Sequence, residues 1–225
     1  DVNFLALSNA AASGTASFRD IDDLTISGGP AVTACGVIYA AVNGVQTTFS
    51  GAAVQGALDS AAGDILIQAG GFLTLNQQVN AGRAAAGDET LADVRLIANG
   101  DITQSAAGII TADELGVRQQ SAVLVVANDV DANTRYDIQL GDANDVNHLA
   151  ALNQFDGGVI AFNDADDLTI NTVSAQTIDG VAFTAISGVQ TTFSGAAVQG
   201  VGDSAAGDIL IQAGGFLTLN QQVNA

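Results

Sequence analysis

The chain has 225 residues, 48% of them hydrophobic, with 26 glycines, one proline, five arginines, no lysine and a net charge of −19. The apolar content excludes a disordered acidic tail, and the charge disfavours nucleic acid and anionic membranes as partners. The acidic residues are 22 aspartates and only two glutamates. Because aspartate bonds nearby amides in turns whereas glutamate favours helices, we expect many turns and little helix.

A shift of 144 residues superimposes 1–81 on 145–225 without a gap. From Val45 to Ala81 the two copies differ at only two positions, whereas 1–44 have drifted further. We therefore divide the chain into a partial repeat copy (1–81), the remainder of the repeat (82–144) and a second copy (145–225). A long internal period is typical of solenoids, so we expect one continuous solenoid without separate globular domains.

Short β-prone runs follow one another along the chain and are joined by Gly, Asn and Asp. Pairs of strands are expected over 64–76, 94–104, 136–150 and 158–171, and a further strand over 122–127. Apolar and polar residues alternate in these runs, which indicates strands with one buried face. The side chains expected to point inward are Ile65, Ile67, Leu73, Leu75, Leu168, Ile170, Ile209, Ile211, Leu217 and Leu219.

One segment, 111–120, has a feature typical of a helix start. Thr111 and Glu114 stand in capping-box spacing. The segment lacks a convincing apolar stripe of helical period, so we interpret it as strand and turn. No apolar run approaches the roughly 18 residues of a membrane helix, and we expect no membrane insertion. The single cysteine, Cys35, excludes an intrachain disulfide.

Two all-β architectures fit many short strands: a string of antiparallel sandwiches, or a parallel β-helix. The β-helix is favoured because its interior accepts stacked Ala, Val, Ile and Leu and its corners accept Gly, Asn and Asp. With roughly 20–29 residues per coil, one period would hold about six coils and span roughly 30 Å. The two copies should then be related by a translation along the axis with some twist, and the chain ends should lie at opposite poles.

Two acidic groups occupy corresponding positions in the two copies. They are Asp20, Asp22 and Asp23, and Asp164, Asp166 and Asp167. Clustered carboxylates suit Ca²⁺, but no EF-hand loop and no calcium-binding nonapeptide is present. We interpret these aspartates as turn-forming residues at coil corners, with weakly bound Ca²⁺ as the alternative.

The sequence offers no catalytic constellation. The only histidine, His148, corresponds to Phe4 in the first copy. Glycosidases need two carboxylates in divergent environments at a cleft, whereas these aspartates recur as a repeated pattern. We therefore expect no catalytic or cofactor-binding residues and no enzyme activity, with a polysaccharide-acting β-helix enzyme as the weaker alternative.

The segments "GDILIQAGGFLTLNQQVNAG", "NGDITQSAAGIITADELGV" and "GGVIAFNDADDLTI" resemble the repeats of filamentous-haemagglutinin-like proteins, the large repetitive adhesins of bacteria. The resemblance implies a right-handed parallel β-helix, a secreted or cell-surface location, and a role in adhesion, biofilm or filament building. We expect a structural segment of an extracellular fibre whose partner is another copy, joined end to end or laterally. The alternative is an adhesin module that recognises a glycan or a neighbouring fibre through exposed polar rows, with a glycan or a host or cell surface as its partner.

Overall fold

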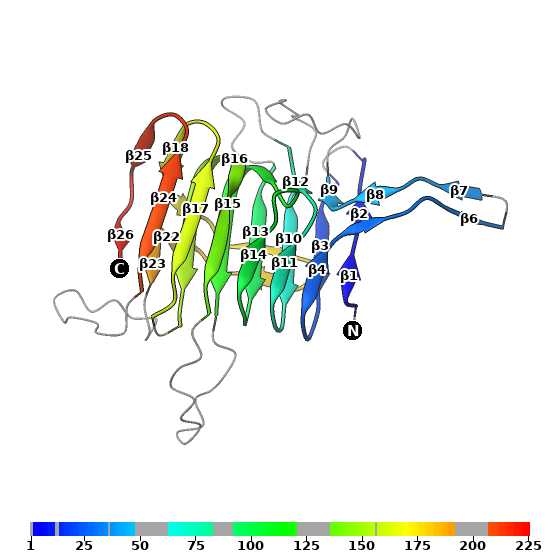
Figure 1. The fold of residues 1–225 in the computed structure, drawn as a ribbon, viewed down its shortest axis with the longest axis horizontal. Helices are drawn as coiled ribbons and strands as arrows, with labels where there is room; N and C mark the ends of the chain where they lie inside the picture. Colours follow the sequence, from blue (N-terminus) through cyan, green and yellow to red (C-terminus); the bar gives the residue numbers. More distant parts are fainter. Residues whose placement is uncertain are drawn as a thin grey trace, which may run out of the picture.

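The computed structural model describes residues 2–11, 14–35, 37–47, 63–82, 92–120, 136–155, 157–191 and 207–225. These residues form strands and no helix, so the all-β expectation is confirmed for them. Eighteen strands form one sheet whose neighbouring strands are all parallel, and the sheet curls until it nearly closes on itself (Figure 1). The strand expected over 122–127 lies outside the described residues.

The large sheet consists of three rows of stacked strands. Row 1 holds β3 (Ala16–Arg19), β10 (Ile65–Ala69), β13 (Val94–Ala98), the second half of β15 (Ile110–Gln119), the end of β16 (Ile138–Asn153), β23 (Val189–Thr191) and β26 (Val223–Asn224). Row 2 holds β1 (Phe4–Leu5), β4 (Leu24–Ile26), β11 (Leu73–Leu75), β14 (Ile102–Gln104), the start of β16, β17 (Ile160–Asp164) and β24 (Ile209–Ala213). Row 3 holds β2 (Leu7–Ser8), β9 (Val45–Gln46), β12 (Val79–Asn80), the start of β15, the middle of β16, β18 (Leu168–Ile170) and β25 (Leu217–Leu219). The chain visits rows 1, 2 and 3 in turn, so each circuit adds one strand to every row.

These pairings correct the relation expected between the two copies. From β3, row 1 continues through β10, β13, β15 and β16, which is four circuits, and the next strand, β17, lies in row 2. Since β3 and β17 occupy the same place in the two copies, one period makes four circuits and one third of another. The estimate of about six coils is therefore wrong. The copies are offset by one row, about a third of a circuit: the sequence "ILIQA" lies in row 1 as β10 and in row 2 as β24.

The physical reason is that some circuits are much longer than expected. Ala16 pairs with Ile65 across a long circuit, because the strands between residues 28 and 43 are inserted between them. Ile65 pairs with Val94 across a shorter one. Inserted segments lengthen a circuit without changing which residues stack, so strand spacing in the sequence does not reveal the coil length.

One continuous apolar core lies inside the rows. Of the ten predicted inward side chains, six are at most 1% exposed: Ile65, Ile67, Leu73, Leu75, Leu168 and Ile170. Ile209 and Ile211 are half-buried and pack against this core. Leu217 and Leu219 are 44% and 58% exposed although they pair with Leu168 and Ile170. Their direction was predicted correctly, and they are exposed because β25 is the last described strand of row 3.

Two sequence predictions about β15 and β16 have different outcomes. The segment 111–120 is a strand, as interpreted. The strand pair expected over 136–150 is instead the single strand β16, whose register shifts between Leu140 and Asn144. The Asn144 side chain accepts a hydrogen bond from the Ile110 amide (3.0 Å) and donates to the Leu140 carbonyl (3.1 Å). These bonds replace missing ladder bonds, which lets the strand continue through a sequence that resembles a turn.

The repeated "DD" and "GG" pairs belong to one type of corner. The Gly71 amide donates to the Asp22 carbonyl (3.0 Å), and the Phe72 amide donates to Asp23 Oδ1 (2.8 Å). A Cβ atom on Gly71 would overlap this carboxylate oxygen, which explains the glycine. The second copy repeats the corner, with Phe216 donating to Asp167 (2.7 Å). Each corner therefore joins two successive circuits, and the two sequence pairs form one structural unit.

Two hairpin arms leave the rows at corresponding positions. Arm 1 comprises β5 (Gly28–Gly29), β6 (Val32–Ala34), β7 (Val37–Tyr39) and β8 (Val42–Asn43), and it projects past the edge formed by β1 and β2 (Figure 1). Arm 2 comprises β19 (Thr172–Val173), β20 (Gln176–Ile178), β21 (Val181–Phe183) and β22 (Ile186–Ser187). Arm 2 packs on the outer side of row 1 and forms a second apolar cluster there.

Candidate functional site

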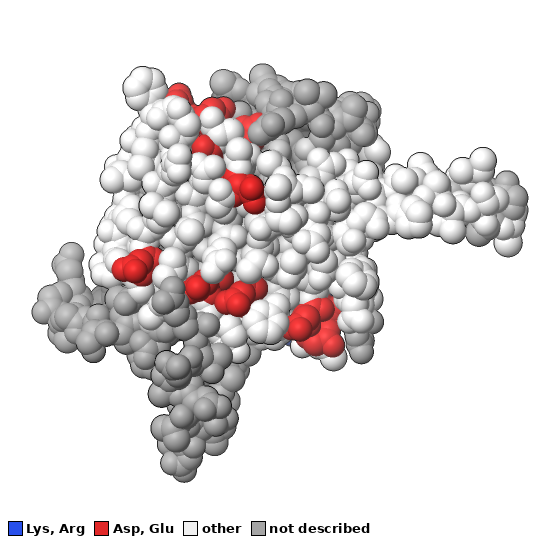
Figure 2. All heavy atoms as spheres, in the orientation of Figure 1, with Lys and Arg blue, Asp and Glu red and all other residues white. Residues whose placement is uncertain are grey.

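The six aspartates singled out in the sequence lie at two corners. Asp20, Asp22 and Asp23 connect β3 to β4, and Asp164, Asp166 and Asp167 lie where β17 leads to β18. On the face that Figure 2 shows, acidic side chains form separate groups with other surface between them. Among the described residues, no group of three or more His, Cys, Asp or Glu side chains is placed to hold a metal ion.

The corner carboxylates that are buried accept hydrogen bonds from backbone amides. Asp164 Oδ1 accepts from the Val146 amide (3.1 Å) and Asp164 Oδ2 from the Asp166 amide (3.3 Å). Asp20 accepts from the amides of Val2 (2.9 Å) and Ile21 (2.7 Å). Burial raises the pKa of Asp164 to about 7, against the opposing effect of its amide donors. These contacts suit turn formation, and weak calcium binding at the corners stays the untested alternative.

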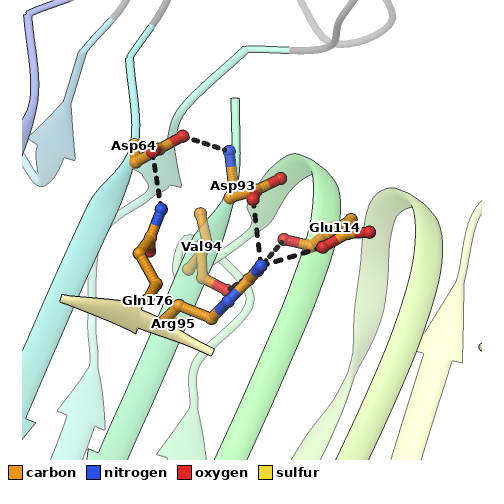
Figure 3. Close-up of polar contacts among 6 residues, drawn as sticks. All are labelled: Asp64, Asp93, Val94, Arg95, Glu114 and Gln176. Atoms are coloured by element: carbon orange, nitrogen blue, oxygen red, sulfur yellow. Dashed lines mark hydrogen bonds and ion pairs between the residues drawn. The ribbon is translucent and has the colours of Figure 1, made fainter. Parts of the chain in front are cut away.

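A second charged cluster, which local sequence pattern did not predict, lies beneath arm 2. Arg95 is on the outer side of β13 and has no exposed surface (Figure 3). Its Nη2 lies 2.9 Å from Asp93 Oδ2 and 2.8 Å from Glu114 Oε2. Its Nη1 donates to the carbonyls of Val94 (3.3 Å) and Glu114 (3.2 Å). The guanidinium is thus held by two carboxylates and two carbonyls, which compensates for its burial.

Arm 2 covers the outer side of this cluster. Gln176 donates to Asp64 Oδ2 (2.6 Å), and the other oxygen of Asp64 accepts from the Asp93 amide (3.2 Å) (Figure 3). The Phe183 ring lies 5.6 Å from the Arg95 guanidinium carbon. Arg118 Cζ lies 5.7 Å from the same ring, so two cations contact one aromatic side chain. These contacts fix arm 2 to the coil body.

The electrostatics of the cluster favour a structural role. Burial raises the pKa of Asp93 to about 7. Desolvation is the main cause, and together with repulsion from Glu114 and neighbouring aspartates it outweighs the attraction of Arg95. Burial also raises the pKa of Asp64. Since Arg95 is fully covered, a substrate cannot reach it in this arrangement. The cluster holds arm 2 through the Gln176–Asp64 hydrogen bond and the contact of Phe183 with Arg95.

The sequence contains a weak signal for this cluster. Arg95 interrupts the apolar run "VRLIA", at an outward position between the inward Val94 and Leu96. It pairs with Gly116 on β15, where a Cβ atom would clash with both Phe183 and the Arg95 side chain. The combination of an arginine inside an apolar strand and a glycine on the neighbouring strand indicates a covered outer face. The covering arm itself is remote in the sequence.

Row 2 also presents a polar row with an aromatic group beside it. Thr25, Thr74 and Thr103 are register partners on successive strands. Next to this row, the Phe72 ring packs edge-on against Tyr136, with 5.7 Å between centroids, and Tyr136 packs against Phe155 at 4.7 Å. Phe72 is 41% exposed. The row thus combines half-buried threonines with a partly exposed aromatic ring two residues before Thr74.

No helix in the described ranges is long and apolar enough to cross a membrane. Comparisons with protein-family models, with curated proteins and with solved structures gave no match to this chain.

Proposed function

We propose that the chain is a segment of a right-handed parallel β-helix that acts as a structural repeat and spacer in a bacterial extracellular fibre. The three rows of parallel strands support the helix, since each circuit buries its apolar side chains against the circuits on either side. The resemblance of the repeats to filamentous-haemagglutinin-like proteins supports the location at the cell surface.

The observation that carries the proposal is the continuity of the rows up to both edges. At one edge the inward side chains of Leu217, Leu219 and Val223 are 41–58% exposed. The last strand there, β26, belongs to row 1, and the first strand at the other edge, β1, belongs to row 2. A second copy can therefore add in the normal order of rows, with β1 beside β24, β2 beside β25 and β3 beside β26. End-to-end stacking would cover the exposed apolar side chains.

A matched pair of variants on the terminal strands tests this stacking. Leu219 points inward and is 58% exposed, whereas Leu210 points outward and is 65% exposed. We expect the chain to form linear multimers with rising concentration in analytical ultracentrifugation. Leu219→Asp should abolish them, and Leu210→Asp, which places its charge on the outer side of the junction, should weaken them much less. Monomers at every concentration, or equal effects of the two variants, would contradict the proposal. Labelling of intact cells with an antibody against the chain tests the surface location separately.

A second candidate function is recognition of a glycan by an adhesin module. The row of Thr25, Thr74 and Thr103 together with the partly exposed Phe72 ring favours it, because hydroxyls and aromatic rings are suited to sugar binding. Binding to a glycan array that is lost in Phe72→Ala and retained in Phe216→Ala, its copy at the open edge, would support this candidate. If the native chain bound no glycan on the array, the result would contradict this candidate function.

We further propose that the chain is not an enzyme and holds no required cofactor. The buried carboxylates of Asp164 and Asp93 are engaged by backbone amides and by Arg95, respectively, rather than being directed toward a common reacting atom. Action on polysaccharides stays the weaker alternative. The release of new reducing ends from bacterial polysaccharides by the purified chain would overturn the non-enzymatic proposal.

A further inference from the structure

The two arms correspond residue by residue, but they differ in what covers them. The shift that superimposes the two copies places arm 1 on arm 2, and the hairpin turns match, with positive φ at Cys35 (51°) and Asp179 (50°). Val32 pairs with Tyr39 in arm 1 as Gln176 pairs with Phe183 in arm 2. The hairpins therefore share both register and turn geometry, and corresponding residues lie on corresponding faces.

One face of arm 2 binds row 1 of its own chain. Ile178, Val181 and Phe183 on this face are 1–9% exposed, and they cluster with Leu66 and with outward residues of β13 and β16. The tip reaches β3, where Ser17 Oγ donates to the Ile178 carbonyl (3.3 Å). Arm 2 thus crosses the strands of row 1 from β16 to β3.

The corresponding face of arm 1 is exposed where the structure describes its side chains. Val32, at the position of Gln176, is 58% exposed. The sequence keeps apolar residues at the positions that bind row 1 in arm 2: Val37 corresponds to Val181, and Tyr39 corresponds to Phe183. An apolar pattern of this kind in a chain of net charge −19 is best explained by a partner surface.

The order of the rows identifies that surface. Arm 2 follows β18 of row 3 in the sequence and packs over row 1. Row 1 is also the row of the next strand of the large sheet, β23. Arm 1 follows β4 in row 2 and precedes β9 in row 3, so the equivalent docking surface for arm 1 is the outer side of row 3. Among the described strands, only β2 lies ahead of β9 in row 3, and Figure 1 shows arm 1 extending past this edge. The described part of the chain supplies no further row 3 strands beyond β2 for arm 1 to pack on.

We propose that arm 1 docks on the outer side of row 3 of a second copy of this chain, as arm 2 docks on row 1 of its own. The inference rests on the proposed end-to-end stacking, which places β25, β18 and the middle of β16 of the second copy directly beyond β2. The outward residues of those strands include Thr218, Thr169 and His148. Arm 1 therefore acts as a clasp across the junction between two copies.

The native cysteine at the tip of arm 1 allows a direct test. Cys35 is exposed and unique, so a maleimide–benzophenone probe can be attached there and photoactivated. Arm 2 spans the strands of row 1 from β16 to β3, and arm 1 should reach equally far along row 3. We therefore expect intermolecular adducts on row 3 of the second copy, on β18, the middle of β16 or the start of β15. The matched control carries the probe at the tip of arm 2, in Cys35→Ser with Asp179→Cys. It should give intramolecular adducts on β3, near Ser17.

A pair of substitutions on opposite faces of arm 1 gives a second test. Val32→Asp places a charge on the docking face, and Ile38→Asp places one on the opposite face, where Ile38 is 77% exposed. Val32→Asp should raise the dissociation constant of the multimer about tenfold or more, and Ile38→Asp should leave it within about twofold. Both positions are exposed, so neither change should unfold the chain.

The outcomes separate the clasp from the stacking on which it rests. Linear multimers without adducts on row 3, or with equal effects of Val32→Asp and Ile38→Asp, would overturn the clasp and leave the stacking proposal standing. A chain that stays monomeric, with adducts confined to its own residues, would overturn both. Multimers that give adducts on β16 and β18, and that are weakened by Val32→Asp but not by Ile38→Asp, would support both the clasp and the stacking.

Discussion

Leu66 and Leu210 occupy the same position in identical local sequence, yet arm 2 covers only Leu66. Leu66 is fully buried, whereas Leu210 is 65% exposed. Replacing leucine by alanine removes three carbon atoms, worth about 2.4 kcal/mol at a fully buried site, and the remaining cavity brings typical losses to about 2–5 kcal/mol. At Leu210 about a third of the side chain is buried, so the expected loss is under about 1 kcal/mol.

Thermal unfolding followed by circular dichroism measures this difference. In a chain of this size, each kcal/mol shifts Tm by about 2–4 °C, so Leu66→Ala should lower Tm by about 4–20 °C and Leu210→Ala by less than about 4 °C. Because the neighbouring residues are identical, intrinsic strand propensity cancels in the comparison. Equal losses at the two sites would refute the placement of arm 2 on row 1 and, with it, the assigned difference between the two arms.

Three further predictions concern the charged groups and the corners. The pKa values of Asp93 and Asp164 are raised from 3.8 to about 7, so their contribution to stability is fully present below about pH 4 and is lost as pH rises through about 7. Tm should therefore be higher at pH 5 than at pH 8, and Asp93→Asn should reduce that difference; an unchanged difference would contradict the assignment. Chelation of divalent cations should shift Tm by less than about 2 °C, whereas a drop of more than about 10 °C would establish a calcium site. Gly71→Ala should cost about 2 kcal/mol or more in chemical denaturation, and adding Asp23→Ala should recover part of the loss; additive losses would argue against the shared corner.

Local sequence pattern correctly predicted the strands over 64–76, 94–104 and 158–171 and the inward faces of β10, β11 and β18. The alternation in "DILIQ" and "FLTL" placed Ile65 and Leu73 in the core correctly, because period-two burial is a property of the strand itself. The aspartate–glycine corners were also correctly read as turns. The alternation also gave the right direction for Leu217, whose exposure depends on the absence of a further described strand in row 3.

The relation between the two copies could not be predicted from strand spacing. The circuit from Ala16 to Ile65 and the much shorter circuit from Ile65 to Val94 occur in the same row, since inserted arms and connections leave the stacking register unchanged. The Arg95 cluster was missed for a similar reason. Its burial depends on Gln176 and Phe183, which are remote from it in the sequence. Features set by contacts between remote segments leave only faint local signals, such as an arginine in an apolar run.

Cryo-electron microscopy of the concentrated protein tests the central claim most directly. If copies continue one another's rows, the images should show unbranched filaments with strand layers about 4.8 Å apart along the axis. The "ILIQA" segments at 65–69 and 209–213 should lie about a third of a circuit apart around that axis, with arm 1 crossing each junction. Discrete globular particles, or filaments in which the two copies are related by translation alone, would contradict the account.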